Sequence, residues 1–336
     1  MNIQSDIKVL DNLLALNLDI SLWSARRKMT AEDLGSTELP PEDLASLGSK
    51  RIADPANLKI FGTLKARATS YLDKHGVRFM SGWAIPQELA GEITAQLIKI
   101  RDEFMLEKEN FLAGYNESVN AWIEKHGEWA DIIRNSVVNP EYVRARMSFR
   151  WQLYKVVPSA MDNSVDDGLC REVESLGSTL FSEVADSARD MWKKVFEGKT
   201  EVTHKALSPL KTLHNKLTEL SFIEPHVMPV ADIISASLQR IPKKGNIVGA
   251  DLLLLQGLVC LLKDSKVLLE HAHKIIQGYG PATVVDYLAS TDLTVAKQEL
   301  SEEEPMPILP ALDKDLTDDF PLVDVVKVEI PSMGLW

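Results

Sequence analysis

The sequence is poor in cysteine, with two among its 336 residues. Neither their number nor their spacing supports a disulfide framework or a zinc site. Cys170 and Cys260 both sit within apolar helical patterns. We therefore expect two buried thiols in a protein of a reducing compartment.

No hydrophobic run in the sequence is long enough to cross a membrane. The most apolar stretch, residues 252–262, has eleven residues and includes Gln256 and Gly257, whereas a membrane-spanning helix takes about 20 residues. The start of the chain lacks the basic residues and the apolar core of a signal peptide. We therefore expect a cytoplasmic protein in which residues 252–262 form a buried core helix.

The motifs that accompany common catalytic and cofactor sites are also missing. The sequence has no phosphate-binding loop, no glycine-rich dinucleotide fingerprint and no nucleophile elbow. His271 and His273 are two residues apart, a spacing that places them on different faces of a helix, where they would not share a metal ion. We therefore predict no catalytic residues, no cofactor, no metal and no enzymatic activity. A pair of catalytic carboxylates assembled by folding is the alternative.

Basic residues are outnumbered by acidic ones, and the chain carries a formal net charge of −12 at pH 7. This balance disfavours nonspecific attraction of the whole protein to nucleic acid or to an anionic membrane, although a local basic patch can still bind either. The charge is also uneven. Residues 301–336 contain nine acidic residues and two lysines, which makes −7 of the total.

Residues 301–336 are also rich in proline and are predicted to form an extended acidic tail. One interpretation is a disordered, solubilising end. The other is a partner-binding peptide, because apolar residues stand among the acids as anchors. The candidate partner-binding residues are Ile308, Leu309, Leu312, Phe320 and Trp336.

Residues 1–85 are predicted to be a mixed segment with a short β element and one helix. From Leu14 to Leu22, large apolar residues stand at every second position, which is typical of a half-buried strand. Asp54 can cap a following helix, Pro55 suits its first turn, and Gly76 can end it. Residues 77–83 are expected to form a second short strand.

Two long apolar stripes dominate the middle of the chain, from Leu89 to Trp122 and from Leu169 to Val195. Steps of three and four residues in the first stripe predict one continuous helix over residues 86–125, which would approach about 60 Å in length. A single narrow stripe on so long a helix needs a partner. We therefore predict a long, coiled-coil-like antiparallel hairpin over residues 86–200, with shorter helices at 128–135 and 141–157 between its arms.

The predicted fold class is therefore mainly α, with the hairpin, additional helices and a small β element from the N-terminal segment. Residues 201–300 continue as a helical segment that prolines interrupt, and residues 301–336 follow as the tail. The two stripes can pack on each other or on another chain, so a homo-oligomer is a second way to cover them.

Arginines and aromatic residues interleave between Tyr142 and Lys155. This mixture can grip phosphates and stack on bases. The competing interpretation buries the aromatics in the core and pairs the arginines with acids of a neighbouring helix. The same two interpretations apply to the basic residues 26–28. The candidate nucleic-acid-binding residues are Arg144, Arg146, Arg150 and Lys155, of which Arg146 and Arg150 would share a helix face.

Several short motifs resemble an uncharacterised bacterial family. They are residues 16–20 (LNLDI) with the following Trp23-Ser24 and basic residues 26–28, residues 47–51 (LGSKR), residues 76–79 (GVRF) and residues 82–86 (GWAIP). The family is catalogued as domain of unknown function thirty-one fifty and occurs on conjugative elements, plasmids and large phages. The resemblance implies a role on mobile genetic elements and supplies no catalytic residues.

The resemblance also implies partners, because genes of this family lie near those of an AAA+ ATPase and of a von Willebrand A-type protein. Together with the two stripes and the tail, it favours a non-catalytic helical adaptor in a multiprotein assembly. The alternative is a nucleic-acid-binding protein that serves recombination or maintenance of the element. Failure to recover a stable partner would count against the adaptor role. A lack of affinity for DNA at low salt would count against the alternative.

Overall fold

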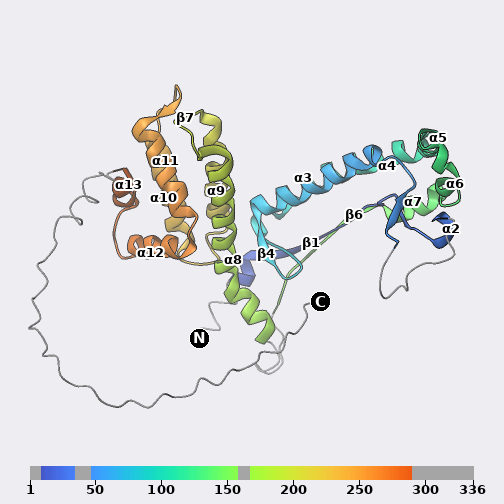
Figure 1. Ribbon diagram of the computed structural model, residues 1–336. Coiled ribbons are helices and arrows are strands. Elements are labelled where there is room, and N and C mark those ends of the chain that lie inside the picture. The colour runs from blue at the N-terminus through green and yellow to red at the C-terminus, as the bar shows by residue number, and fades with distance from the viewer. Residues whose placement is uncertain (1–8, 35–46, 158–166, 290–336) are drawn as a thin grey trace, which may run out of the picture. The chain divides into compact units, whose positions relative to one another are not determined.

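The structure is a computed structural model that describes residues 9–34, 47–157 and 167–289. Its fold is mainly helical with small antiparallel sheets, which confirms the mainly α part of the predicted class (Figure 1). Within the described ranges, no helix combines the length and the apolar character needed to span a membrane.

The largest sheet has four strands in the order β4-β5-β1-β6. The central strand β1 (Leu13–Ser21) confirms the strand predicted from the alternating residues. The strand expected at residues 77–83 is a hairpin of β4 (Val77–Phe79) and β5 (Gly82–Pro86). The outer strand β6 (Ser148–Tyr154) corrects the predicted helix at 141–157, of which only Pro140–Arg146 is helical, as α7.

The first predicted helix is confirmed as α3 (Lys59–His75), which ends where Gly76 follows. Asp54 caps a 3-10 turn, η1 (Pro55–Leu58), that leads into α3, and its carboxylate accepts a hydrogen bond of 2.8 Å from the Ala56 amide. The long helix predicted over residues 86–125 is two helices, α4 (Ala90–Ala113) and α5 (Tyr115–Lys125), separated at Gly114. Glycine weakens a helix interior, and it favours the break at this point.

The remaining described elements are further helices and small strand pairs. Those in the first half of the chain are β2 (Arg26–Lys28), α2 (Ala31–Leu34), β3 (Ser49–Arg51), η2 (Gln87–Leu89), η3 (Gly127–Trp129) and α6 (Ala130–Arg134). Later in the chain come α8 (Asp167–Met191) with the π turn η4 (Trp192–Phe196), β7 (Glu201–Val202), η5 (His204–Leu207), α9 (Ser208–Glu219), α10 (Val227–Arg240), β8 (Ile247–Val248), α11 (Gly249–Leu262), α12 (Ser265–Ile276) and α13 (Pro281–Ala289).

The two apolar stripes are buried, but they do not form the predicted hairpin. The stripe of α4 packs with α3 and with Phe149 of β6 in one hydrophobic core. The stripe of α8 packs with β4, α11 and α12 in a second core. Periodicity identifies the face of a helix that is buried, but not the element that covers it. Each stripe is therefore covered within this chain.

The two cysteines differ from their prediction as well. Cys170 on α8 and Cys260 on α11 are both exposed free thiols. Val259 and Leu261, on either side of Cys260, are buried, and Leu169 beside Cys170 is partly buried. The apolar pattern therefore identified both helices correctly but placed the thiols on the wrong face.

Candidate functional site

The short pair of β2 and β3 concentrates positive charge. In its register Arg26 stands opposite Arg51, and Arg27 stands opposite Lys50. Like charges directly opposite each other destabilise a strand pair. Lys50 is neutralised by the Asp33 carboxylate, and the hydrogen bond from Lys50 lowers the pKa of that carboxyl. In the described part of the chain no carboxylate pairs with Arg26 or Arg51. The positive charges of these two arginines therefore remain unfavourably opposite each other in the strand pair.

Helix α7 brings a second group of cations to the same place. Asn139 caps the helix by accepting a hydrogen bond of 2.7 Å from the Tyr142 amide, and Pro140 occupies the first turn. Tyr142 and Arg146 are four residues apart and share a helix face. The guanidinium carbon of Arg146 lies 5.2 Å from the centroid of the Tyr142 ring, and that of Arg27 lies 5.5 Å from it. Tyr142 therefore joins β2 to α7 through two cation–π contacts.

These residues surround a cavity of about 550 Å³, which we call the basic hollow. Among the residues that the structure describes, five cationic side chains and no carboxylate line it. The polar chemistry of the hollow is that of an anion-binding surface, in which guanidinium groups can make paired hydrogen bonds to phosphate oxygens. Its lining residues are Ser21, Leu22, Trp23, Ser24, Arg26, Arg27, Lys28, Tyr142, Ala145, Arg146, Ser148 and Arg150.

A buried lysine fixes the junction between α7 and β6, from which Arg146 and Ser148 extend into the hollow. Lys108 of α4 is 8% exposed, and its ammonium donates a hydrogen bond of 2.6 Å to the carbonyl oxygen of Met147. Burial lowers the pKa of Lys108, and the positive charge of Arg144 lowers it further. Lys108 thus stabilises the junction through this hydrogen bond, and it does not itself line the hollow.

The four predicted nucleic-acid-binding residues separate into two groups. Arg144 forms ion pairs with Glu109 and Glu141, and Lys155 lies 3.7 Å from a carboxylate oxygen of Asp11. Both follow the competing interpretation, in which the cation is used within the fold. Arg146 and Arg150 both line the basic hollow, together with the basic residues 26–28. The two do not share a helix face as predicted, because Arg146 belongs to α7 and Arg150 to β6.

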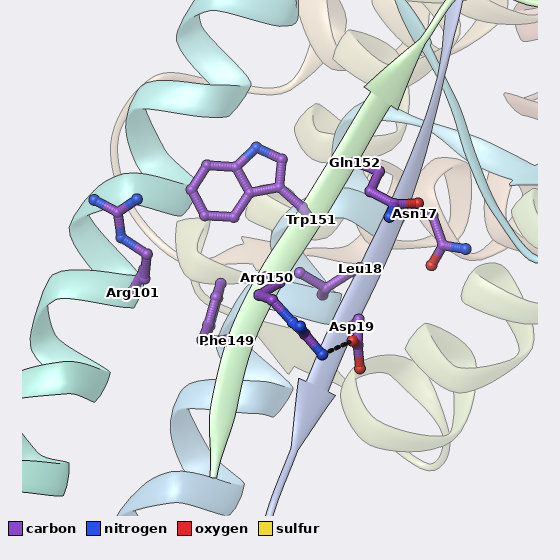
Figure 2. Close-up of a pocket in the computed structure, with 8 residues that line it drawn as sticks. All are labelled: Asn17, Leu18, Asp19, Arg101, Phe149, Arg150, Trp151 and Gln152. Carbon is purple, nitrogen blue, oxygen red and sulfur yellow. Dashed lines mark hydrogen bonds and ion pairs between the residues drawn. The ribbon is translucent and has the colours of Figure 1, made fainter. Parts of the chain in front are cut away.

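A second cavity lies on the sheet and shares one lining residue with the basic hollow. The register of β1 places Asn17 opposite Gln152, Asp19 opposite Arg150 and Ser21 opposite Ser148. Figure 2 shows Asn17, Asp19 and Gln152 on one side of the strands, while Phe149 and Trp151 point toward α4 and Arg101. Arg150 reaches Asp19 at 3.0 Å between its Nη2 and the carboxylate Oδ2 (Figure 2). A cavity of about 730 Å³ lies at these strands and shares Arg150 with the basic hollow.

Sequence reasoning missed Arg51, Asn17 and Gln152. The signal for Gln152 was present, because Phe149, Trp151 and Leu153 alternate with polar residues in the pattern of a strand. No local pattern in the sequence marks Arg51, because its position opposite Arg26 results from the pairing of two strands.

Two further sets of residues bear on the site. The predicted partner-binding residues Ile308, Leu309, Leu312, Phe320 and Trp336 lie outside the described residues. Among the residues that the structure describes, no three histidine, cysteine or acidic side chains gather in a way that could hold a metal ion.

No curated protein and no solved structure shows significant similarity to the chain. The model of one family, described as "Protein of unknown function (DUF3150)", matches residues 10–264. This match spans most of the sequence, including both groups of basic residues and the whole of the four-stranded sheet, and it confirms the resemblance that the short motifs indicated. The chain belongs to the DUF3150 family.

Proposed function

We propose that the protein binds nucleic acid, with the basic hollow as the site that holds the phosphate backbone. The observation that carries this proposal is the convergence of two basic segments, residues 26–28 and residues 146–150, on one cavity that no carboxylate of the described residues lines. The two segments are more than a hundred residues apart in the sequence, and the ring of Tyr142 brings Arg27 and Arg146 together.

The net charge of −12 does not oppose this proposal, because of how the charge is distributed. More than half of it belongs to residues 301–336. Near the hollow, acids neutralise Arg144 and Lys50, while no ion pair within the described residues joins Arg26, Arg27 or Arg146 to an acid. A local cluster of free guanidinium groups binds phosphates by releasing the counterions that the nucleic acid has condensed.

The triple variant R26A/R27A/R146A tests the proposal. Each guanidinium that contacts a phosphate adds about 0.9 to the slope of log affinity against log salt. We therefore expect the variant to lower the slope by about 2 to 3 and to weaken binding roughly 100-fold at about 50 mM NaCl. Fluorescence anisotropy with a labelled 30-base-pair duplex and with its single strand, titrated over a range of NaCl concentrations, measures both quantities.

A matched control removes the same amount of charge elsewhere. In the variant R134A/R189A/K194A three cations are lost from exposed ion pairs with Asp131, Asp186 and Asp190. We expect this control to bind both probes nearly as the wild type does. Equal losses in the two triple variants would show that net charge alone matters, and failure of the wild type to bind either probe at low salt would refute the proposal.

The adaptor role is the second candidate, with an AAA+ ATPase or a von Willebrand A-type protein as partner on a mobile genetic element. Its support is the family membership together with the apolar anchors at residues 308–336. The two stripes no longer contribute to it, because the chain itself covers them. Affinity purification from the native host, with a variant that ends at residue 300 as the comparison, distinguishes a tail-dependent partner from none.

A further inference from the structure

Beyond the backbone contacts of the basic hollow, the main sheet contains a segment suited to reading bases. Strand β1 pairs with β5 only over Leu13–Leu16, and with β6 over Ala15–Ser21. From Asn17 to Ser21 the sheet therefore consists of two strands alone, β1 and residues 148–152 of β6. We call this part the ribbon.

The two faces of the ribbon differ. Leu18 and Ile20 of β1 face the core that α3 and α4 share, together with Phe149 and Trp151 of β6. Directly opposite residues of an antiparallel pair project to the same face. The other face therefore presents three polar cross-strand pairs, and four of their six residues are exposed while Asn17 and Ser148 are partly exposed. The pairs are Asn17 with Gln152, Asp19 with Arg150, and Ser21 with Ser148.

The side chains of this face have the chemistry of base recognition. Asparagine and glutamine amides can each bond bidentately to adenine, and arginine does so to guanine. Within the described residues, no hydrogen bond involves the side-chain amide of Asn17 or that of Gln152. Arg150 is held by Asp19 at 3.0 Å yet remains 71% exposed, so it is oriented but still accessible.

We propose that the ribbon enters the major groove of duplex DNA and reads its sequence through Asn17, Gln152 and Arg150, which rests on the proposed function of the basic hollow. A major groove about 12 Å wide admits a two-stranded ribbon, whose strands are about 4.8 Å apart. The ligand is duplex rather than single-stranded, because the aromatic residues of the ribbon point to the core and leave no ring on the polar face for an unpaired base to stack on.

Cations flank the ribbon where the walls of a groove would lie. The Lys65 ammonium donates a hydrogen bond of 3.3 Å to the Ile20 carbonyl at the free edge of β1. On the β6 side, the Arg101 guanidinium lies 5.5 Å from the Trp151 ring. The basic hollow adjoins one end of the ribbon through Ser21, Ser148 and Arg150. Arg101 also pairs with Asp102 at 2.8 Å, so the basic hollow supplies the main positive charge for a sugar–phosphate backbone while the ribbon meets the bases.

Selection from a pool of random duplexes, followed by anisotropy on the selected duplex and on a scrambled duplex of the same composition, tests the proposal. We expect the wild type to prefer the selected duplex at least about tenfold, which corresponds to one good bidentate contact. The variant N17A/Q152A should remove this preference, because it lowers affinity for the selected duplex far more than affinity for the scrambled duplex. Replacing the purines of the selected duplex with 7-deazapurines, which lack the N7 acceptor of the major groove, should lower wild-type affinity in the same way.

The outcomes separate this inference from the proposed function. If no sequence is enriched, if N17A/Q152A keeps the preference, or if the single strand binds more tightly than the duplex, the ribbon does not read a major groove. Salt-dependent binding of the scrambled duplex that R26A/R27A/R146A weakens would then still support the basic hollow. If no duplex and no single strand binds at low salt, both proposals fail. Far-ultraviolet circular dichroism of each variant confirms that these exposed substitutions leave the fold intact.

Discussion

Replacing Gly82 with alanine is expected to lower the free energy of unfolding by about 3 to 5 kcal/mol. Gly82 begins β5, and a Cβ atom at this position would lie 2.1 Å from the carbonyl oxygen of Leu16 and 3.2 Å from the Cα of Asn17. Both atoms belong to the backbone of β1, the central strand, so they cannot move aside without breaking the strand pairing. Urea unfolding followed by circular dichroism measures the effect.

A glycine in open space provides the control for this experiment. Gly62 lies inside α3, and no atom is within 4 Å of a Cβ built there. Gly62→Ala is therefore expected to stabilise the protein by about 0.5 to 1 kcal/mol, because alanine has the higher helix propensity. If Gly82→Ala cost less than about 1 kcal/mol, β1 and β5 would not approach as closely as the structure has them. The same variant should also disturb the ribbon, since Asn17 follows directly on the strained contact.

The faces of β1 and β6 could be predicted from the sequence, but their pairing could not. Leu16, Leu18 and Ile20 alternate with polar residues, and this pattern identified β1 correctly. In β6 the alternation of Phe149, Trp151 and Leu153 is equally regular, yet the helix predicted over residues 141–157 includes all three residues. An alternation with a period of two residues can be recognised over only five residues. It should therefore outweigh the prediction of a helix over the same residues.

The partners of the two stripes were beyond the reach of periodicity. Phe104 of α4 packs edge-to-face on Phe61 of α3 and on Phe149 of β6, with ring centroids 5.2 and 5.7 Å away. These three residues come from distant segments, and each is simply apolar in its own pattern. Two stripes of similar length look complementary in a sequence, but any apolar surface of suitable shape can cover a helix. The long hairpin is therefore only one of several packing arrangements of the two stripes, and periodicity does not distinguish between them.

The candidate site shows the same limit. The sequence identifies both basic segments as candidates for binding nucleic acid, with the competing interpretation that their cations pair with acids of the fold. Their convergence depends on Arg27 and Arg146 meeting the ring of Tyr142, a contact over more than a hundred residues. Once the fold places the acids, the alternatives separate: Arg144 has Glu109 within reach, and Arg146 has none among the described residues.

A second large effect is expected at Lys216, which connects the two hydrophobic cores. Lys216 of α9 is 5% exposed, and its ammonium donates hydrogen bonds of 2.7 Å to the Asp73 carbonyl of α3 and 2.6 Å to the Glu183 carboxylate of α8. The other oxygen of Glu183 accepts a hydrogen bond of 3.0 Å from the amide of Arg78 in β4. One buried cation thus satisfies groups from α3 and α8, whose apolar faces belong to different cores.

Lys216→Met is expected to lower the free energy of unfolding by about 3 kcal/mol, because it leaves a poorly solvated carboxylate without its cation and the Asp73 carbonyl without its donor. Methionine keeps most of the aliphatic volume, so lost packing contributes little. Glu183→Gln removes the charge that Lys216 neutralises and keeps the amide contact. In a double-mutant cycle the two substitutions should couple by about 1 to 3 kcal/mol, measured by urea unfolding with circular dichroism.

An exposed lysine with the same pairing chemistry distinguishes burial from charge. Lys194 pairs with Asp190 at 2.8 Å, but their side chains are 73% and 67% exposed. Lys194→Met should therefore change the free energy of unfolding by less than about 0.5 kcal/mol. Similar small effects at both lysines would mean that water reaches Lys216 and that the two cores are held together by apolar contacts alone. A large effect confined to Lys216 would identify this buried cation as the connection through which α3, and with it the strands that carry the ribbon, is fixed to the helices of the second core.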